Sequence, residues 1–180
     1  MALAPSEGLA IEDFVHAALA FIRENQAWAA PMVFALAFGE SLAVISLLLP
    51  ATAILFAVSG LLGASGIPFW PCWVAAAAGA VLGDAVSYWI GFHFKHRLPA
   101  IWPLSRAPDL LVRGERFFAR WGIAGVFAGR FFGPLRCAVP LVAGSCAMPQ
   151  LPFQVANVAS AMAWATGILS PGLIAGAVFL

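Results

Sequence analysis

The chain contains very little charge. Acidic and basic residues together make up 9% of its 180 residues, whereas hydrophobic residues make up 63%. About a quarter of the residues in a soluble domain are charged. The low charge of this chain therefore excludes a soluble domain and indicates an integral membrane protein. A net charge of +1 and scattered basic residues provide no face for binding nucleic acid. We therefore expect an all-α polytopic membrane protein with residues 1–180 forming a single membrane domain.

Cysteine and histidine are scarce. The three cysteines lie in apolar stretches without the spacing of a metal site or a disulfide framework, so we expect no metal and no cofactor. A phosphohistidine-type lipid phosphatase needs a nucleophilic and a basic histidine near its phosphate. His16, His93 and His96 lie in polar segments away from the apolar core, so we do not expect an enzyme. The N-terminus lacks a basic region before an apolar run, and no cleaved signal peptide is expected.

Two arginines lie in the otherwise apolar segment 127–140, with Gly133 and Pro134 between them. An arginine at the centre of a membrane helix costs roughly 2.5 to 3.5 kcal/mol, so Arg130 and Arg136 need an anion or water nearby. Because proline removes a backbone donor and glycine loosens the turn, we expect the helix to break here. The two arginines would then meet at the tip of a re-entrant hairpin. The alternative is that both snorkel to the lipid headgroups.

A second interrupted segment follows Glu40, after which 43 residues carry no charge. Pro50 divides its first part into 41–49 and 51–63, and neither piece is long enough to cross a membrane core of about 30 Å. We expect another re-entrant hairpin, with its tip at Pro50 to Thr52. A kinked helix of full length is the alternative.

Two segments are predicted to span the membrane. Residues 74–92 follow a turn at 66–71, where prolines bar helix continuation, and residues 151–167 end or kink at Pro171. In the first segment small residues recur at every fourth position, which lets another helix approach closely. These small residues are Ala75, Gly79 and Gly83.

Polar segments flank these apolar ones. Residues 11–24 have the spacing of an amphipathic helix, which either lies in the interface or forms the polar end of a first membrane helix. Residues 93–120 form a basic loop, which the positive-inside rule places in the cytoplasm, and 109–120 can form a helix within it. We interpret the loop as an orientation signal, and contact of its arginines with lipid phosphates is the alternative.

An internal repeat relates the two halves. Residues 57–91 align without a gap on residues 138–172, with ten identical positions, several of them glycine or proline. We predict two repeats, at about 36–92 and 121–172, each a re-entrant hairpin followed by a spanning helix. Paired interrupted segments mark the midplane site of many transporters, often with the halves inverted. The two tips would then meet near the bilayer centre.

Such a site suits a phosphate, because guanidinium groups bind its oxygens bidentately and the N-terminus of a half-helix adds a favourable field. Glu40 could neutralise an arginine in the empty site and take a proton when substrate binds, which would couple transport to a proton gradient. Asp84 is either a second titrating group or a structural partner of Arg130 or Arg136.

An ordered set of residues over about 36–172 resembles the DedA (SNARE-associated, VTT-domain) family of membrane proteins. The matching residues are Glu40, Gly83-Asp84, Tyr88, Gly91, Phe117-Phe118, Trp121-Gly122, Gly129-Arg130-Phe131, Gly133-Pro134, Arg136, Pro140, Ala143-Gly144, Met148, Phe153, Asn157 and Trp164. The resemblance implies an essential acid at Glu40, paired arginines at Arg130 and Arg136, and supporting residues at Tyr88 and Asn157. Many members carry aspartate in a Pro-Gly-Asp turn, whereas this chain has Pro50-Ala51-Thr52.

The resemblance also implies a function, because family members are implicated in moving polyprenyl-phosphate carriers or phospholipids across the bacterial membrane with the proton motive force. We expect a flippase for undecaprenyl phosphate in the bacterial inner membrane, with membrane lipids and protons as partners. The alternatives are a phosphatidylethanolamine flippase or scramblase, and a proton-coupled small-ion transporter that uses Glu40 and Asp84. A structural role without transport and a homo-oligomer are left open.

Overall fold

A computed structural model describes residues 24–42, 51–65, 67–95, 109–132, 136 and 138–179. Within these ranges the regular secondary structure is helical, which confirms the expected all-α class. The predicted amphipathic helix at 11–24 lies outside them, apart from Glu24. The elements are η1 (Gln26–Trp28), α2 (Ala29–Ser41), α3 (Ala51–Ser65), α4 (Phe69–Phe94), α5 (Asp109–Gly129), α6 (Ala138–Ser145) and α7 (Gln150–Phe179).

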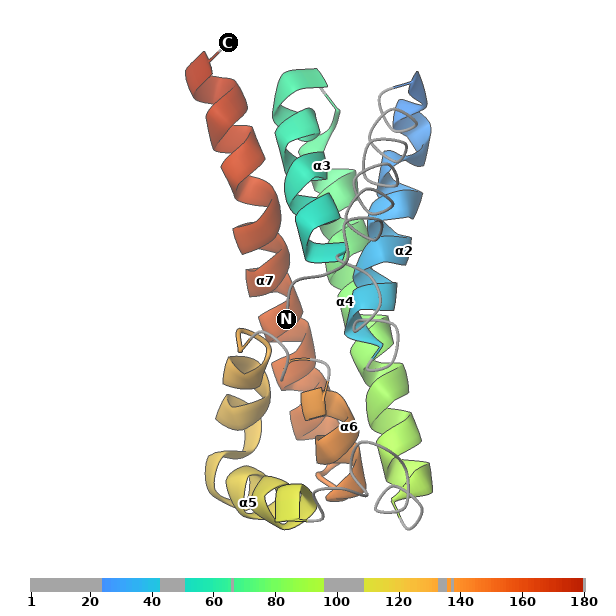
Figure 1. The fold of residues 1–180 in the computed structure, drawn as a ribbon, viewed down its shortest axis with the longest axis vertical. Helices are drawn as coiled ribbons and strands as arrows, with labels where there is room; N and C mark the ends of the chain where they lie inside the picture. The colour runs from blue at the N-terminus through green and yellow to red at the C-terminus, as the bar shows by residue number, and fades with distance from the viewer. Residues whose placement is uncertain are drawn as a thin grey trace, which may run out of the picture.

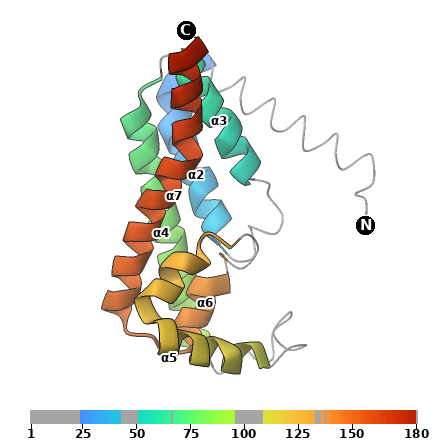
Figure 2. The ribbon, with the colours of Figure 1, turned by 90° about the vertical axis from the view of Figure 1, so that its left-hand side faces the viewer.

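Two long helices, α4 and α7, run along the molecule in opposite directions (Figure 1). The shorter helices α2 and α3 occupy the upper half, and α6 with the second part of α5 occupies the lower half, an arrangement that Figure 2 shows from the side. Helices α2 and α3 run in opposite directions, as do the second part of α5 and α6. Helices α2 and α6 pack against α4, and α3 packs against α7.

Glycines allow α2 to lie close to α4. Gly79 and Gly83 face the backbone of Phe34 and Phe38 in α2, and a Cβ atom at position 83 would lie 2.6 Å from the Cβ of Ser41 and 2.7 Å from the carbonyl oxygen of Phe38. Such distances leave no room for a side chain. The close helix contact predicted from the spacing of the small residues is therefore confirmed.

Helix α2 (Ala29–Ser41) precedes most of segment 41–49, which is the predicted first arm of the first hairpin. It ends at Ser41, and Leu42 is extended. Glu40, which precedes the predicted arm, lies in the last turn of α2. It is buried there and forms an ion pair with Arg136. Helices α2 and α3 contact each other in the same half of the molecule, whereas the alternative of a kinked full-length helix runs through residues 43–50. Residues 43–50, including Pro50, lie outside the described ranges.

Neither Pro71 nor Pro171 ends a helix. Pro71 lies in the first turn of α4, where a backbone N–H has no partner within the helix and proline is tolerated. Helix α7 continues through Pro171 to Phe179, and the N–H of Gly172 donates a hydrogen bond of 2.9 Å to the hydroxyl of Ser59 in α3. Among the described residues, α4 is the helix with the length and apolar composition needed to cross a membrane.

Helix α5 contains a sharp change of direction. Gly122 has φ 45° and ψ −121°, a conformation that other residues rarely adopt. The part before Gly122 lies across the lower end of the molecule, and the part after it rises to mid-height (Figure 2). The helix predicted at 109–120 is therefore confirmed, and it continues beyond the kink. Because α5 ends at Gly129 and α6 begins at Ala138, the predicted break is confirmed, although Gly133 and Pro134 themselves lie outside the described ranges.

Candidate functional site

Three buried charged residues, Glu40, Asp84 and Arg130, come together with a fourth, Arg136, that is largely buried. Glu40 lies in the last turn of α2, Asp84 lies within α4, Arg130 follows α5, and Arg136 precedes α6. Glu40, Asp84 and Arg130 are 4%, 7% and 5% exposed, and the side chain of Arg136 is 11% exposed. Both arginines are therefore held inside the protein, and the alternative in which they snorkel outward is wrong.

Each arginine forms an ion pair with a different acid. Arg130 Nη1 lies 2.8 Å from an Asp84 carboxylate oxygen, and Arg136 Nη1 lies 3.0 Å from Oε1 of Glu40. When all four groups are ionised, their charges sum to zero. These pairs connect the break between α5 and α6 to α4 and to α2, so the cluster joins segments that are far apart in the sequence. We call Glu40, Asp84, Arg130 and Arg136 the charged cluster.

One face of α7 supports both guanidinium groups. Arg130 Nη1 donates to Asn157 Oδ1 at 3.1 Å and to the hydroxyl of Ser160 at 3.0 Å. The ring of Trp164 lies 4.8 Å from Cζ of Arg136, a distance typical of a cation–π interaction. The predicted supporting residue Asn157 therefore contacts the cluster directly. Ser160 and Trp164 were not predicted as site residues, although their helical spacing from Asn157 puts all three on one face.

Thr52 also contacts the cluster. It is the second residue of α3, and its hydroxyl donates a hydrogen bond to Oε1 of Glu40. Thr52 is the position at which this chain departs from the DedA pattern of aspartate. Here a neutral donor, rather than a third carboxylate, faces Glu40.

Tyr88, the other predicted supporting residue, has different contacts. Its hydroxyl donates a hydrogen bond of 2.5 Å to the carbonyl oxygen of Met148, between α6 and α7, and its ring stacks on Phe153 with 4.3 Å between centroids. Tyr88 lies one helical turn beyond Asp84, and its described contacts hold α4 against the start of α7.

Several polar atoms of the cluster lack a partner within the described part of the chain. They are Nε and Nη2 of Arg130, Nη2 of Arg136 and Oε2 of Glu40. Nε and Nη2 form one edge of a guanidinium group, with parallel N–H bonds that match the two oxygens of an oxyanion. An unpaired buried donor costs about 1 to 3 kcal/mol, and a charged one costs more. The free edge of Arg130 therefore favours an anionic ligand with at least two oxygens.

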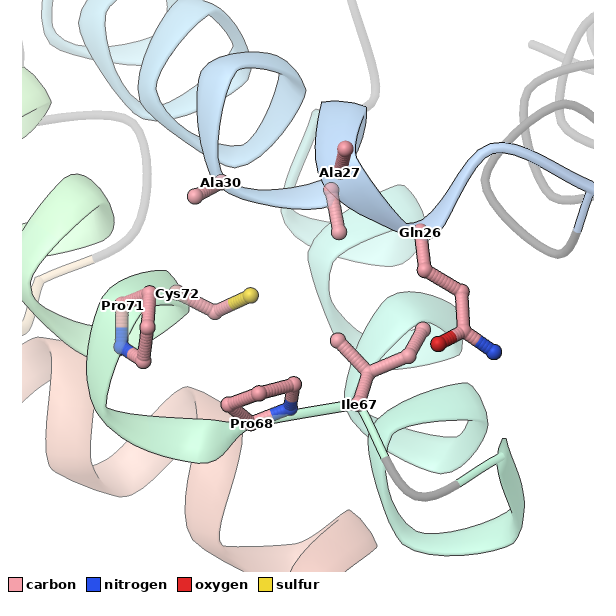
Figure 3. Close-up of a pocket in the computed structure, with 8 residues that line it drawn as sticks. Gln26, Ala27, Ala30, Ile67, Pro68, Pro71 and Cys72 are labelled. Atoms are coloured by element: carbon pink, nitrogen blue, oxygen red, sulfur yellow. The ribbon is translucent and has the colours of Figure 1, made fainter.

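A separate apolar hollow lies at the upper end of the molecule, where the start of α2 meets the start of α4 (Figure 3). Its volume is about 270 Å³, and its lining includes Ala30, Ile67, Pro68 and Cys72. Glu40 lies ten residues after Ala30 in α2, or about 15 Å further along the helix. The lining contains no charged side chain, so the hollow is not part of the charged cluster.

Comparison with known proteins identifies a family. The family model described as the VTT domain matches residues 44–173. The inner membrane protein YabI of Escherichia coli is 33% identical over 157 residues, which cover 87% of this chain and 62% of YabI. An uncharacterized membrane protein of Buchnera aphidicola is 30% identical over 156 residues, which cover 87% of this chain and 61% of the relative.

A further relative matches over a shorter range. An uncharacterized membrane protein of Mycobacterium tuberculosis is 39% identical over 106 residues, which cover 57% of this chain and 49% of the relative. The chain thus spans about three fifths or less of the length of these relatives. No solved structure matches it significantly. The expected location in a bacterial inner membrane agrees with the name of the E. coli relative. Since the VTT-domain model covers most of the sequence, this chain belongs to the VTT-domain (DedA) family of membrane proteins.

Proposed function

We propose that this protein carries a lipid with a phosphate head across the bacterial inner membrane, and that Arg130 and Arg136 bind the phosphate. The observation that carries the proposal is the buried, unpaired Nε–Nη2 edge of Arg130, with Nη2 of Arg136 as a further free donor. Two guanidinium groups within one cluster can share the oxygens of a single phosphate. No other buried cationic donor without a partner is found among the described residues.

The favoured cargo is a polyprenyl phosphate, with undecaprenyl phosphate as the specific candidate. A long apolar tail can remain in the bilayer while a small phosphate head reaches arginines inside the protein. The resemblance to DedA proteins supports this substrate class. A phospholipid such as phosphatidylethanolamine is the alternative cargo, since its head also contains a phosphate.

The proposed transport path uses two re-entrant hairpins related as inverted repeats. Helix α3 of the first predicted repeat packs on α7 of the second, and α6 of the second packs on α4 of the first. Gly91 and Gly172 occupy equivalent positions in the repeat alignment, and they contact the backbone of Leu141 in α6 and of Ser59 in α3. This reciprocal packing supports a site that can open alternately toward either side of the membrane. The basic loop 93–120 would then face the cytoplasm.

Proton coupling would arise from the acids of the charged cluster. In the arrangement described here, each arginine is neutralised by a carboxylate. A phosphate that binds the arginines competes with these carboxylates, and protonation of Glu40 or Asp84 would remove the competing charge. Transport of the phosphate would in this way depend on the proton motive force.

The test is lipid flipping in proteoliposomes that contain a fluorescent polyprenyl phosphate. Arg130→Lys keeps a positive charge near Asp84 but removes the bidentate edge, so we expect flipping to fall by about tenfold or more, as for loss of an interaction of 1.4 kcal/mol or more. Arg136→Ala should abolish it. The control is Arg120→Lys, because Arg120 is exposed on α5 beside Trp121, and it should flip lipid at the wild-type rate.

Unchanged flipping by both Arg130→Lys and Arg136→Ala would exclude the arginine site. A proton flux through the wild-type protein that lipid phosphate does not alter would favour small-ion transport instead.

A further inference from the structure

The charged cluster contains one unpaired atom that accepts hydrogen bonds. Oε1 of Glu40 lies 3.0 Å from Nη1 of Arg136 and accepts a hydrogen bond from the hydroxyl of Thr52. Oε2 of the same carboxylate has no hydrogen-bond partner among the described residues, and Glu40 is only 4% exposed. A buried carboxylate oxygen without a donor is unfavourable. A ligand that supplies a hydrogen-bond donor as well as oxygens would pair this oxygen and the free N–H groups of the arginines together.

We infer that Glu40 selects a phosphate monoester head over a phosphodiester head, through its free oxygen Oε2. This inference rests on the proposed function. The second pKa of a phosphate monoester is about 6, so a monoester can carry a P–O–H group near neutral pH. That hydroxyl can donate to Oε2 while the other phosphate oxygens accept the free N–H groups of Arg130 and Arg136. All four unpaired atoms of the cluster then have partners.

A phosphodiester cannot complete the same set. Its head has no P–O–H group, so it would place an unprotonated oxygen against the unprotonated Oε2 of Glu40. Two such oxygens repel each other, and neither gains a hydrogen bond. For a diester to bind, Glu40 would first have to take a proton from solvent. The monoester brings its own proton, which it shares with Glu40.

Net charge does not explain the selection. A singly protonated monoester and a diester phosphate both carry one negative charge, and both face the same charged groups. These groups are Glu40, its partner Arg136, and the neighbouring pair of Arg130 and Asp84. The monoester head has one hydrogen-bond donor that the diester head lacks. Oε2 of Glu40 is the buried acceptor that can pair with this donor. Glu40 is thus a specificity-determining residue in addition to any role in proton coupling.

The test compares farnesyl phosphate with its methyl diester, which has the same tail and the same negative charge when the monoester holds one proton. Binding is measured at about pH 6 with the full chain in nanodiscs, where the monoester retains a proton. We expect the wild-type protein to bind the monoester at least about tenfold more tightly, as for a hydrogen bond to a charged group.

Glu40→Gln is the decisive variant. Arg136 and Thr52 both donate to the position of Oε1, so the amide oxygen stays there and the NH₂ group replaces Oε2. A donor then faces the ligand, so the affinities for the monoester and the diester should differ by no more than about twofold. Asp84→Asn is the matched control, because it removes a charge of the same sign and keeps Oε2. The tenfold preference should persist in this variant even if both affinities change.

Equal binding of the two probes by the wild-type protein would overturn this inference. Binding that still required Arg130 and Arg136 would leave the proposed function standing. Binding of neither probe, or binding that survives loss of both arginines, would overturn the proposed function as well. A preference retained by Glu40→Gln would assign the selection to another group and refute the role of Glu40.

Discussion

The ion pair between Asp84 and Arg130 provides the most direct test of the charged cluster. Arg130 is 5% exposed, and Asp84 is its one charged partner among the described residues. The other groups that accept from Nη1, on Asn157 and Ser160, are neutral. Asp84→Ala would therefore leave a buried guanidinium group with hydrogen bonds but without a compensating charge.

Removing one partner of a buried ion pair typically costs about 3 to 5 kcal/mol, and we expect a loss of this size in the free energy of unfolding. The double variant Asp84→Ala/Arg130→Met removes both charges and fills part of the space, so it should be more stable than Asp84→Ala by about 2 kcal/mol or more. Reversible unfolding in mixed detergent micelles measures both values.

Glu24→Ala is the control for replacing an acid by alanine, because Glu24 is exposed near the start of the described chain. It should change stability by less than about 0.5 kcal/mol. A cost below about 1 kcal/mol for Asp84→Ala, or a double variant no more stable than the single one, would refute a buried and mutually dependent pair.

Two further variants test the packing around the cluster. Gly83→Val should destabilise the protein by about 3 kcal/mol or more in the same unfolding assay, because its side chain would overlap the backbone of Phe38. Gly60→Ala is the control at an open position, where no atom lies within 4 Å of an added Cβ, and it should be neutral or slightly stabilising. Tyr88→Phe should cost about 1 to 3 kcal/mol by leaving the carbonyl of Met148 unpaired, without changing the ratio of monoester to diester binding. A changed ratio would place Tyr88 in the phosphate site.

The sequence determined features that depend on the cost of placing a residue type in an apolar environment. Low charge established the membrane class, and the VTT-domain match confirms the family. Gly133 and Pro134 predicted the break between Arg130 and Arg136, because their backbone chemistry disfavours a continuous helix. The four charged residues were predicted as site residues because a charge in the apolar interior of a membrane requires an opposite charge or water nearby. Their roles in transport remain predictions.

The tertiary structure decided which acid forms an ion pair with which arginine. Sequence separation does not show that Asp84 pairs with Arg130 and Glu40 with Arg136, or that Ser160 and Trp164 of α7 support the two arginines. These contacts depend on how closely α2, α4 and α7 approach. Hydropathy also treats Glu40 as the boundary of an apolar segment, whereas Glu40 lies buried inside α2. A carboxylate can lie inside a buried helix when the fold supplies its cation, and that cation comes from a part of the chain about a hundred residues away.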